Sequence, residues 1–329
     1  MLSLQGESRE DGVDKPFHPV KITSLKEKDD FYIRDVKKVE TFNNEYYVLC
    51  NNSENVLAVF NESGEEIREI GCWGNGHGEH GQINDFCIDK KNGRVLILCP
   101  NSIVIEYTLQ GEYITKNKIS NSVFWNIASI DGNILCTTNH RTFTEGDDAY
   151  LFYLFDENFN LLRKHTPVLP QHMGMFSLIT MPLKTINGQY MYSDFYTHRV
   201  YMLDKAGIIQ KTYEYDINDL MPYRYFSDYD LFSEHQMEYN FILDNIAMNG
   251  MIFSIYKSGE QVRVALNQTD GENIKDIIVD GVIPKFYSVD NNYIISVCTK
   301  ENVERLGLKM QEDINDVYYY IVRYNVTNH

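Results

Sequence analysis

Histidine and glutamate side chains gather in one glycine-rich segment of the chain, and these residue types could bind a divalent metal. Residues 76–80 read Gly-His-Gly-Glu-His, which brings His77, Glu79 and His80 within four positions of one another. Two histidines three positions apart can share a zinc ion when they lie on a helix. The glycines disfavour a helix here, and a zinc site would need a further ligand from elsewhere in the chain. We therefore predict no cofactor and retain a divalent metal as the less favoured alternative.

Other catalytic signatures are missing from the sequence. There is no Gly-x-Ser-x-Gly motif, which would indicate the nucleophile of an α/β-hydrolase. The glycines of residues 74–78 are not followed by a helical pattern, as a dinucleotide-binding loop would require. Paired carboxylates such as Glu65 and Glu66 could serve a glycosidase only if acids met at a suitable distance in the fold. The sequence thus indicates no catalytic residue and favours a protein that is not an enzyme.

The overall charge and the apolar runs limit the classes of partner. The chain carries 47 acidic and 30 basic residues, a net charge of −17, which disfavours binding to nucleic acid. No run of 18 apolar residues is present, so we predict no membrane-spanning segment. Residues 1–15 lack the basic and apolar regions of a signal peptide. Most of the six cysteines follow apolar runs, which favours buried thiols over disulfides, and we expect a monomer.

A scaffold for these residues is indicated by a pattern of strands and turns that recurs six times. Tyrosine (24) and phenylalanine (17) are frequent, and both favour the pleated surface of a sheet. In each repeat an apolar strand leads to a tight turn rich in Asn and Gly, which marks a β-hairpin. The first turns lie at residues 43–44, 91–93, 131–133, 186–188, 248–250 and 290–292. The third strands end at Phe60, Tyr107, Phe155, Leu203, Leu266 and Tyr324.

The spacing of the repeat predicts the fold. A four-stranded unit that recurs every 47 or 48 residues between Phe60 and Leu203 has the size of a propeller blade. We therefore predict an all-β fold, a six-bladed β-propeller of four-stranded antiparallel blades that forms a single domain over residues 1–329. The sixth repeat ends after its third strand, so residues 18–25 are predicted to form the outermost strand of the last blade and close the ring. Residues 1–17 are predicted to be a flexible lead-in.

Two stretches resemble NHL repeats. Residues 71–83 resemble that family's glycine-rich lead-in to a strand. Residues 192–204 resemble the family's pair of strands, with Asp194 and Arg199 at its Asp and Arg positions and Thr197 where Asn is usual. The whole chain is similar to the divergent six-bladed propellers common in Bacteroidetes, many of them secreted or lipid-anchored. The resemblance implies a periplasmic or cell-surface location, and because the motif residues are structural in that family, it implies no catalytic residue.

The long connections of the predicted ring all fall on one face. In a four-stranded blade, the loop between the second and third strands lies on the same face as the connection to the next blade. The long segments belong to these two classes and span residues 71–82, 140–149, 165–176, 217–239 and 300–316. Loops held by a rigid scaffold often carry function, and surfaces rich in aromatic residues and Arg suit sugars and peptides. The candidate ligand-binding residues on this long-loop face are Trp73, His77, His140, Arg141, Tyr196, His198, Arg224 and Tyr225.

Two functions follow from this face. The favoured one is a non-enzymatic binding propeller that recognises a glycan, a peptide or a partner protein. The alternative is a metal-assisted lyase or hydrolase, in which His77, His140, His198 and His235 would converge near the axis, as the resemblance to NHL-type lyases implies. The aromatic residues of 217–239 could instead form a lid that simply packs on the propeller.

Overall fold

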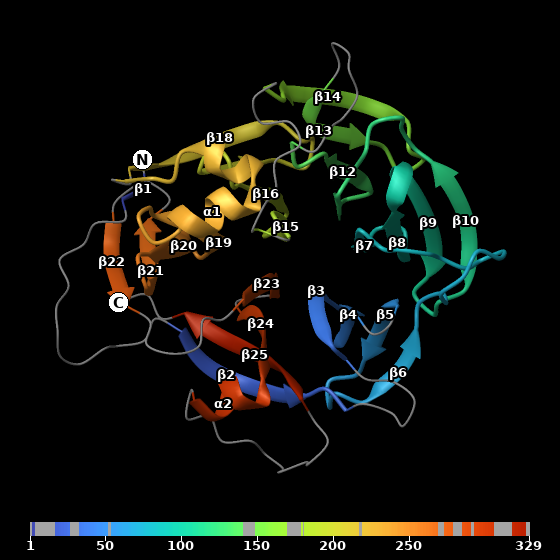
Figure 1. Cartoon of the computed structure of the whole chain (residues 1–329). Helices are drawn as coiled ribbons and strands as arrows, with labels where there is room; N and C mark the ends of the chain where they lie inside the picture. The colour runs from blue at the N-terminus through green and yellow to red at the C-terminus, as the bar shows by residue number, and fades with distance from the viewer. Residues whose placement is uncertain are drawn as a thin grey trace.

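The computed structural model of the protein is a ring of six sheets that follow one another around a central axis in chain order (Figure 1). This arrangement confirms the predicted six-bladed β-propeller. The structure describes residues 2–3, 17–26, 33–51, 54–140, 149–169, 179, 181–216, 219–268, 273–278, 285–290, 293–305 and 318–326. Arg141 lies outside the described residues, as do most of the predicted lead-in and parts of four of the five long segments.

The first three blades each contain four antiparallel strands, which follow one another from the axis outward. Blade 1 consists of β3 (Asp35–Phe42), β4 (Glu45–Asn51), β5 (Asn55–Phe60) and β6 (Glu66–Glu69). Blade 2 consists of β7 (Asp85–Asp89), β8 (Arg94–Cys99), β9 (Ile103–Thr108) and β10 (Tyr113–Lys118), with a short 3-10 turn, η1 (Pro100–Ser102), before β9. Blade 3 consists of β11 (Asn126–Ile130), β12 (Asn133–Thr137), β13 (Tyr150–Phe155) and β14 (Leu161–Pro167).

The last three blades follow the same plan. Blade 4 consists of β15 (Leu183–Ile186), β16 (Gln189–Asp194), β17 (Arg199–Leu203) and β18 (Ile209–Asp216), and β1 (Leu2–Ser3) pairs with β18 in parallel. Blade 5 consists of β19 (Phe241–Met248), β20 (Met251–Ser258), β21 (Gln261–Gln268) and β22 (Asn273–Ile278). Blade 6 consists of β23 (Lys285–Asp290), β24 (Tyr293–Thr299), β25 (Tyr319–Val326) and β2 (Phe17–Ser24).

Short helical segments lie in the connections. The 3-10 turn η3 (Tyr223–Ser227) and helix α1 (Tyr229–His235) precede β19, and α2 (Lys300–Arg305) follows β24. Phe232 of α1 packs edge-on against Phe241, with ring centroids 5.3 Å apart, so α1 is fastened to blade 5. Among the described residues, none of the helices is long and apolar enough to cross a membrane.

The tight turns between the first two strands form where Asn and Gly predicted them. Asn43 and Asn44 have φ angles of 51° and 61°, and Asn249 and Gly250 have φ angles of 52° and 76°. Two successive residues at positive φ match the twist of the flanking strands, which is why Asn and Gly are selected there. The turn predicted at residues 290–292 falls largely outside the described residues.

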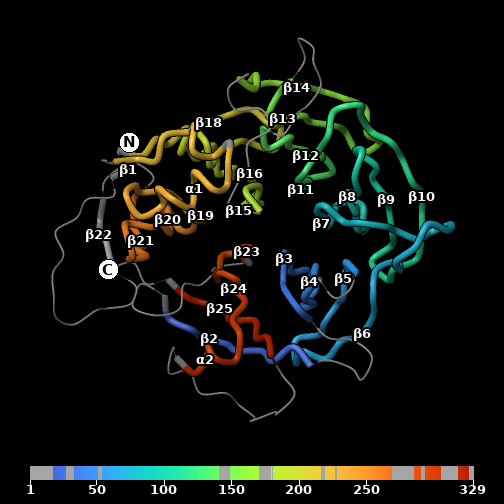
Figure 2. Tube along the Cα trace, viewed as in Figure 1, coloured from blue at the N-terminus to red at the C-terminus, as the bar shows by residue number. Residues whose placement is uncertain are grey.

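The ring closes through the N-terminal strand, as predicted. Strand β2 pairs antiparallel with β25, so that Ile22 lies opposite Val322, and Figure 2 shows the blue strand beside the red one. Beyond β2, the amide of Lys26 donates a hydrogen bond of 2.8 Å to the carbonyl of Gly64 in blade 1. The N-terminal segment therefore completes the last blade and is also joined to the first.

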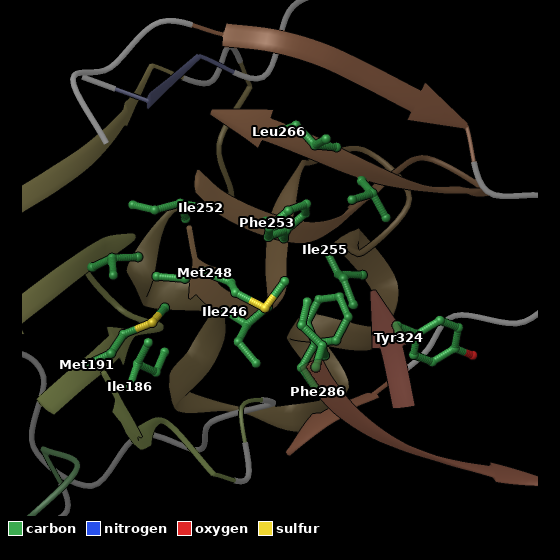
Figure 3. Close-up of a cluster of buried hydrophobic side chains, with 14 of the residues drawn as sticks. Ile186, Met191, Ile246, Met248, Ile252, Phe253, Ile255, Leu266, Phe286 and Tyr324 are labelled. Atoms are coloured by element: carbon green, nitrogen blue, oxygen red, sulfur yellow. The ribbon is translucent and has the colours of Figure 1, made fainter. Parts of the chain in front are cut away.

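Apolar side chains fill the spaces between neighbouring blades. In blades 4 to 6, Met191, Ile246, Phe253 and Phe286 belong to one buried cluster (Figure 3). In β13, five of the six residues are buried, so both faces of this strand are covered. A sheet covered on both faces needs a near-continuous apolar run, which explains why the third strands show little alternation of apolar and polar residues.

Candidate functional site

A buried ion pair joins the innermost strands of the first blades. Nζ of Lys38 in blade 1 lies 2.9 Å from Oδ1 of Asp85 in blade 2, and the two side chains are 5% and 0% exposed. Oδ2 of Asp85 accepts a hydrogen bond of 2.9 Å from the amide of Ile127 in blade 3. Burial acts to lower the pKa of Lys38, but Asp85 and Glu40 outweigh it and raise that pKa above its ordinary value. A charged lysine and its carboxylate thus connect three consecutive blades.

The same arrangement recurs in the second half of the ring. Nζ of Lys184 in blade 4 lies 2.5 Å from Oδ1 of Asp244 in blade 5. Oδ2 of Asp244 accepts a hydrogen bond of 3.2 Å from the amide of Phe286 in blade 6. Each half of the ring therefore has a lysine, an aspartate and a backbone amide on successive blades, and these contacts hold the innermost strands in register.

A chain of amide side chains extends from the first ion pair toward blade 4. Nδ2 of Asn126 donates to Asp85 at 3.2 Å, and Nδ2 of Asn139 donates to Oδ1 of Asn126 at 2.6 Å. The hydroxyl of Tyr192 in blade 4 donates to Oδ1 of Asn139 at 3.3 Å. Buried polar groups that are all hydrogen-bonded restrict side-chain movement, so Asn139 is held in a defined position.

A cavity of about 230 Å³ lies at the axis, at the end of the ring where the innermost strands begin. Its lining residues are Asp35, Lys37, Gln82, Ile83, Asn84, Trp125, Asn139, Ile179, Met181 and Lys285. Most of them are the first residues of an innermost strand or the residues just before one. The second strands of the blades also end on this side, so the cavity lies on the long-loop face.

The charged side chains of the cavity, among the residues that the structure describes, are two lysines and one aspartate. Burial lowers the pKa of Lys37, and Asp35 opposes this effect. Burial also lowers the pKa of Lys285, against the opposing effects of Asp35 and Asp244. Within the described part of the chain, neither lysine takes part in an ion pair, in contrast to Lys38. The cavity wall therefore includes two partly buried ammonium groups for which the described residues offer no carboxylate at ion-pair distance.

Three of the predicted site residues lie in and beside the connections of blades 3 and 4. Nε2 of His140 lies 3.2 Å from Oδ2 of Asp194, and the His140 ring packs edge-on against Tyr196, with centroids 5.1 Å apart. His198 lies beside Phe226, with ring centroids 6.3 Å apart, and burial lowers the pKa of His198 to about 4. His140, Tyr196 and His198 are thus brought together around Asp194 and are buried.

Trp73 and His77 lie on the connection between blades 1 and 2. The Trp73 side chain is 44% exposed, and its backbone pairs with that of His80. The His77 ring packs edge-on against Tyr113, with centroids 4.6 Å apart, on the outermost strand of blade 2. The hydroxyl of Tyr107 donates to the carbonyl of Gly78 at 3.1 Å and anchors this connection. Trp73 and His77 therefore occupy the rim and do not line the cavity.

Arg224 and Tyr225 lie on the segment that carries η3 and α1. The Arg224 guanidinium lies 5.0 Å from the centroid of the Tyr225 ring, and Tyr225 contacts His235 and Tyr239 at centroid distances of 4.5 and 5.5 Å. The neighbouring Phe226 is buried in the cluster beneath this segment. The segment thus buries one aromatic face, as the lid interpretation expects, and leaves Arg224 exposed on the other.

The histidines needed for the metal-assisted alternative lie in three separate places. His140 and His198 both lie near Asp194, whereas His77 contacts blade 2 and His235 belongs to α1. Among the residues that the structure describes, no three His, Cys, Asp or Glu side chains are grouped so that they could hold a metal ion.

Several cavity residues were not among the predicted candidates. Trp125 lies just before an innermost strand, Lys285 begins one, and Lys37 is the third residue of another. The sequence pattern could have indicated this region, because the start of each predicted inner strand must approach the axis on the long-loop face. The prediction rests on the long segments, which do not include these short stretches.

Comparisons with known proteins agree with the fold. A family model, DUF5128, described as a 6-bladed beta-propeller, matches residues 4–268. The structure is similar to that of a protein from Bacteroides fragilis that is inferred to be exported, with a TM-score of 0.78, 13% identity and 99% of each chain covered. It is also similar to a member of the DUF4221 family from Bacteroides vulgatus, with a TM-score of 0.63, 11% identity, and 95% of this chain and 98% of that chain covered. No curated protein sequence matches the chain.

Proposed function

Because the chain belongs to the DUF5128 family of six-bladed β-propellers, we propose that it is a non-enzymatic binding propeller. Its long-loop face recognises a glycan, a peptide or a partner protein, and the axial cavity is the centre of that face. The observation that carries the proposal is the cavity itself, which joins an indole, several amides and charged groups from different blades. Convergent polar groups within a concave wall are typical of ligand sites.

Of the three ligand classes, the cavity favours a glycan. At about 230 Å³ it is smaller than the roughly 300–1,000 Å³ of sites for drug-sized ligands, so it suits a single sugar ring. Gln82 and Asn84 carry both donors and acceptors, which sugar hydroxyls require, and Trp125 supplies an aromatic surface. The rim residues Trp73, Arg224 and Tyr225 would contact the further residues of a longer glycan.

The NHL-like character of the blades is part of the same proposal. Asp194 accepts hydrogen bonds from the amide of Tyr196 at 3.1 Å and from the hydroxyl of Thr197 at 2.7 Å. Arg199 forms an ion pair of 2.6 Å with Glu214 on the neighbouring strand. These contacts support structural roles for the motif residues and leave ligand binding to the cavity.

The two tryptophans allow a direct test, because the chain contains only Trp73 and Trp125. In a Trp73→Phe variant, the intrinsic fluorescence reports on the cavity alone. A glycan array with the unaltered protein identifies the sugars to titrate. We expect these sugars to change the Trp125 fluorescence, and we expect Trp125→Ala to weaken binding about tenfold or more.

Trp73→Ala is the matched control, since it removes the other indole from the rim. If Trp125→Ala leaves the affinity for every array hit unchanged, the axial cavity is not the binding site. An array without any hit, together with no fluorescence change, would overturn the glycan proposal.

A further inference from the structure

Four lysines lie on the innermost strands near the axis, and they divide into two pairs. Lys38 and Lys184 are each neutralised by an aspartate of the next blade, at 2.9 and 2.5 Å. Lys37 and Lys285 line the cavity and have no such partner among the described residues. Because a buried charge is normally paired, two partly buried lysines that have no carboxylate at ion-pair distance among the described residues call for an anionic partner.

The local charge of the cavity differs from that of the whole chain. Among the described residues, its charged side chains are Lys37, Lys285 and Asp35, and these two positive charges and one negative charge sum to +1. The complete chain has a net charge of −17. The surface of so acidic a protein repels anions in general. The positive charge of the cavity is therefore a local feature.

The two lysines approach the cavity from neighbouring blades. Lys37 lies on β3 of blade 1 and Lys285 begins β23 of blade 6, and these two strands are adjacent around the axis. The pairing of β3 with β4 shifts register between Val36 and Lys38, which marks a β-bulge at Lys37. Bulges often redirect a side chain next to a functional site. Here the bulge allows Lys37 to line the cavity while its neighbour Lys38 binds Asp85.

We propose that the cavity binds the carboxylate of an acidic sugar, a uronic acid residue at the end of a glycan, between Lys37 and Lys285. This inference rests on the proposed function and specifies its ligand. The two ammonium groups bind the carboxylate, and the amides of Gln82 and Asn84 bind the ring hydroxyls. Asp35 repels any anion in the cavity. A sugar acid offsets this repulsion through the hydrogen bonds of its hydroxyls, whereas a small inorganic ion does not.

The experiment compares sugars that differ only in charge. Methyl glucuronide and methyl galacturonide are titrated against the neutral methyl glucoside and methyl galactoside, with acetate as a bare carboxylate, by the fluorescence of Trp125 in the Trp73→Phe variant. We expect at least one uronide to bind about tenfold more tightly than its neutral counterpart, since hydrogen bonds to charged groups contribute that much. The preference should weaken as salt is added.

Variants of the lysines test the assignment. Lys37→Met and Lys285→Met should each remove most of the preference for the uronide and leave the neutral sugar unaffected. Lys118→Met, on the exposed outermost strand of blade 2, is the matched control and should change nothing. Asp35→Asn removes the negative charge and should strengthen uronide binding.

The outcomes separate this inference from the proposed function. If neutral sugars bind as tightly as uronides, and calorimetry shows that Trp125→Ala abolishes the binding of both, the cavity binds glycans but the acidic-sugar inference is wrong. If acetate binds as tightly as the uronides, the site recognises a carboxylate without its sugar, and the inference is again wrong. If none of these sugars binds, the acidic-sugar inference fails, and the glycan proposal fails with it if the array also gives no hit.

Discussion

At the scale of single residues, Asp194 organises the connections of blades 3 and 4. Its carboxylate accepts hydrogen bonds from the turn that contains Tyr196 and Thr197 and also contacts His140. Burial acts to raise the pKa of Asp194, but His140 and the hydrogen bonds of Thr197 hold it below its ordinary value. His140 and His198 have φ angles of 57° and 50°, a left-handed conformation that costs about 1–2 kcal/mol for a residue with a Cβ. The contact between His140 and Asp194 offsets part of this cost at His140.

The buried His198 predicts how stability depends on pH. Burial lowers its pKa from 6.5 to about 4, so as the pH falls through this interval the unfolded chain takes up a proton that the folded protein does not. His198 therefore costs roughly 3 kcal/mol of stability by pH 4. We expect His198→Asn, which suits a positive φ, to make urea-unfolding free energies fall less steeply between pH 6.5 and 4 than in the unaltered protein.

His18→Asn serves as the control, because His18 is exposed on β2. It replaces a histidine by asparagine at a surface position and so reports the effect of the substitution itself. If the unfolding free energies of His198→Asn and the unaltered protein fall in parallel across this interval, His198 is not the cause of the loss of stability at low pH.

At the scale of elements, the end of the closing strand packs tightly against a turn of blade 1. A Cβ added to Gly64 would lie 1.8 Å from the carbonyl oxygen of Ser24, the last residue of β2. The contact is with backbone, so a flexible side chain cannot move aside to relieve it. This turn therefore needs glycine both for its φ of 78° and for the close approach of β2.

Gly188 provides the matched comparison for Gly64. It has a similar φ of 74°, but no atom lies within 4 Å of an added Cβ. Both Gly64→Ala and Gly188→Ala introduce backbone strain, and only the first also displaces β2. We expect Gly64→Ala to lose about 1–3 kcal/mol more in urea unfolding than Gly188→Ala. Equal losses would mean that β2 does not pack on this turn.

At the scale of the whole molecule, stability depends on closure of the ring. Each blade buries both faces against its neighbours, so an incomplete blade 6 would expose the edge of β25 and weaken its contacts with blades 1 and 5. Deleting residues 1–25 removes β2 and should lower the melting temperature by several degrees, consistent with a loss of a few kcal/mol.

The control deletion ends at residue 16 and leaves β2 in place. Among the described elements, this deletion removes only the two-residue strand β1. It should therefore lower the melting temperature less than the deletion of residues 1–25 does. If the two truncated proteins melt at the same temperature, β2 contributes nothing beyond the segment that precedes it.

The sequence by itself determined the four-stranded blades, the number of blades and the closure of the ring. The third strands predicted to end at Phe60, Phe155 and Leu203 end at those residues in β5, β13 and β17. This success has a local cause, because apolar runs, Asn and Gly turns and a regular repeat are encoded in neighbouring residues. The missing fourth strand of the last repeat likewise pointed to residues 18–25, and β2 spans Phe17–Ser24.

Only the tertiary structure decided which side chains share a site. Trp73 and His77, which lie in a segment rich in chemically versatile residues, occupy the rim, whereas Lys37, Trp125 and Lys285 meet at the axis although they are far apart in the sequence. Their meeting depends on how the blades turn about the axis and on the bulge at Lys37. These features arise from packing between blades, and the residue pattern within any one blade does not specify them.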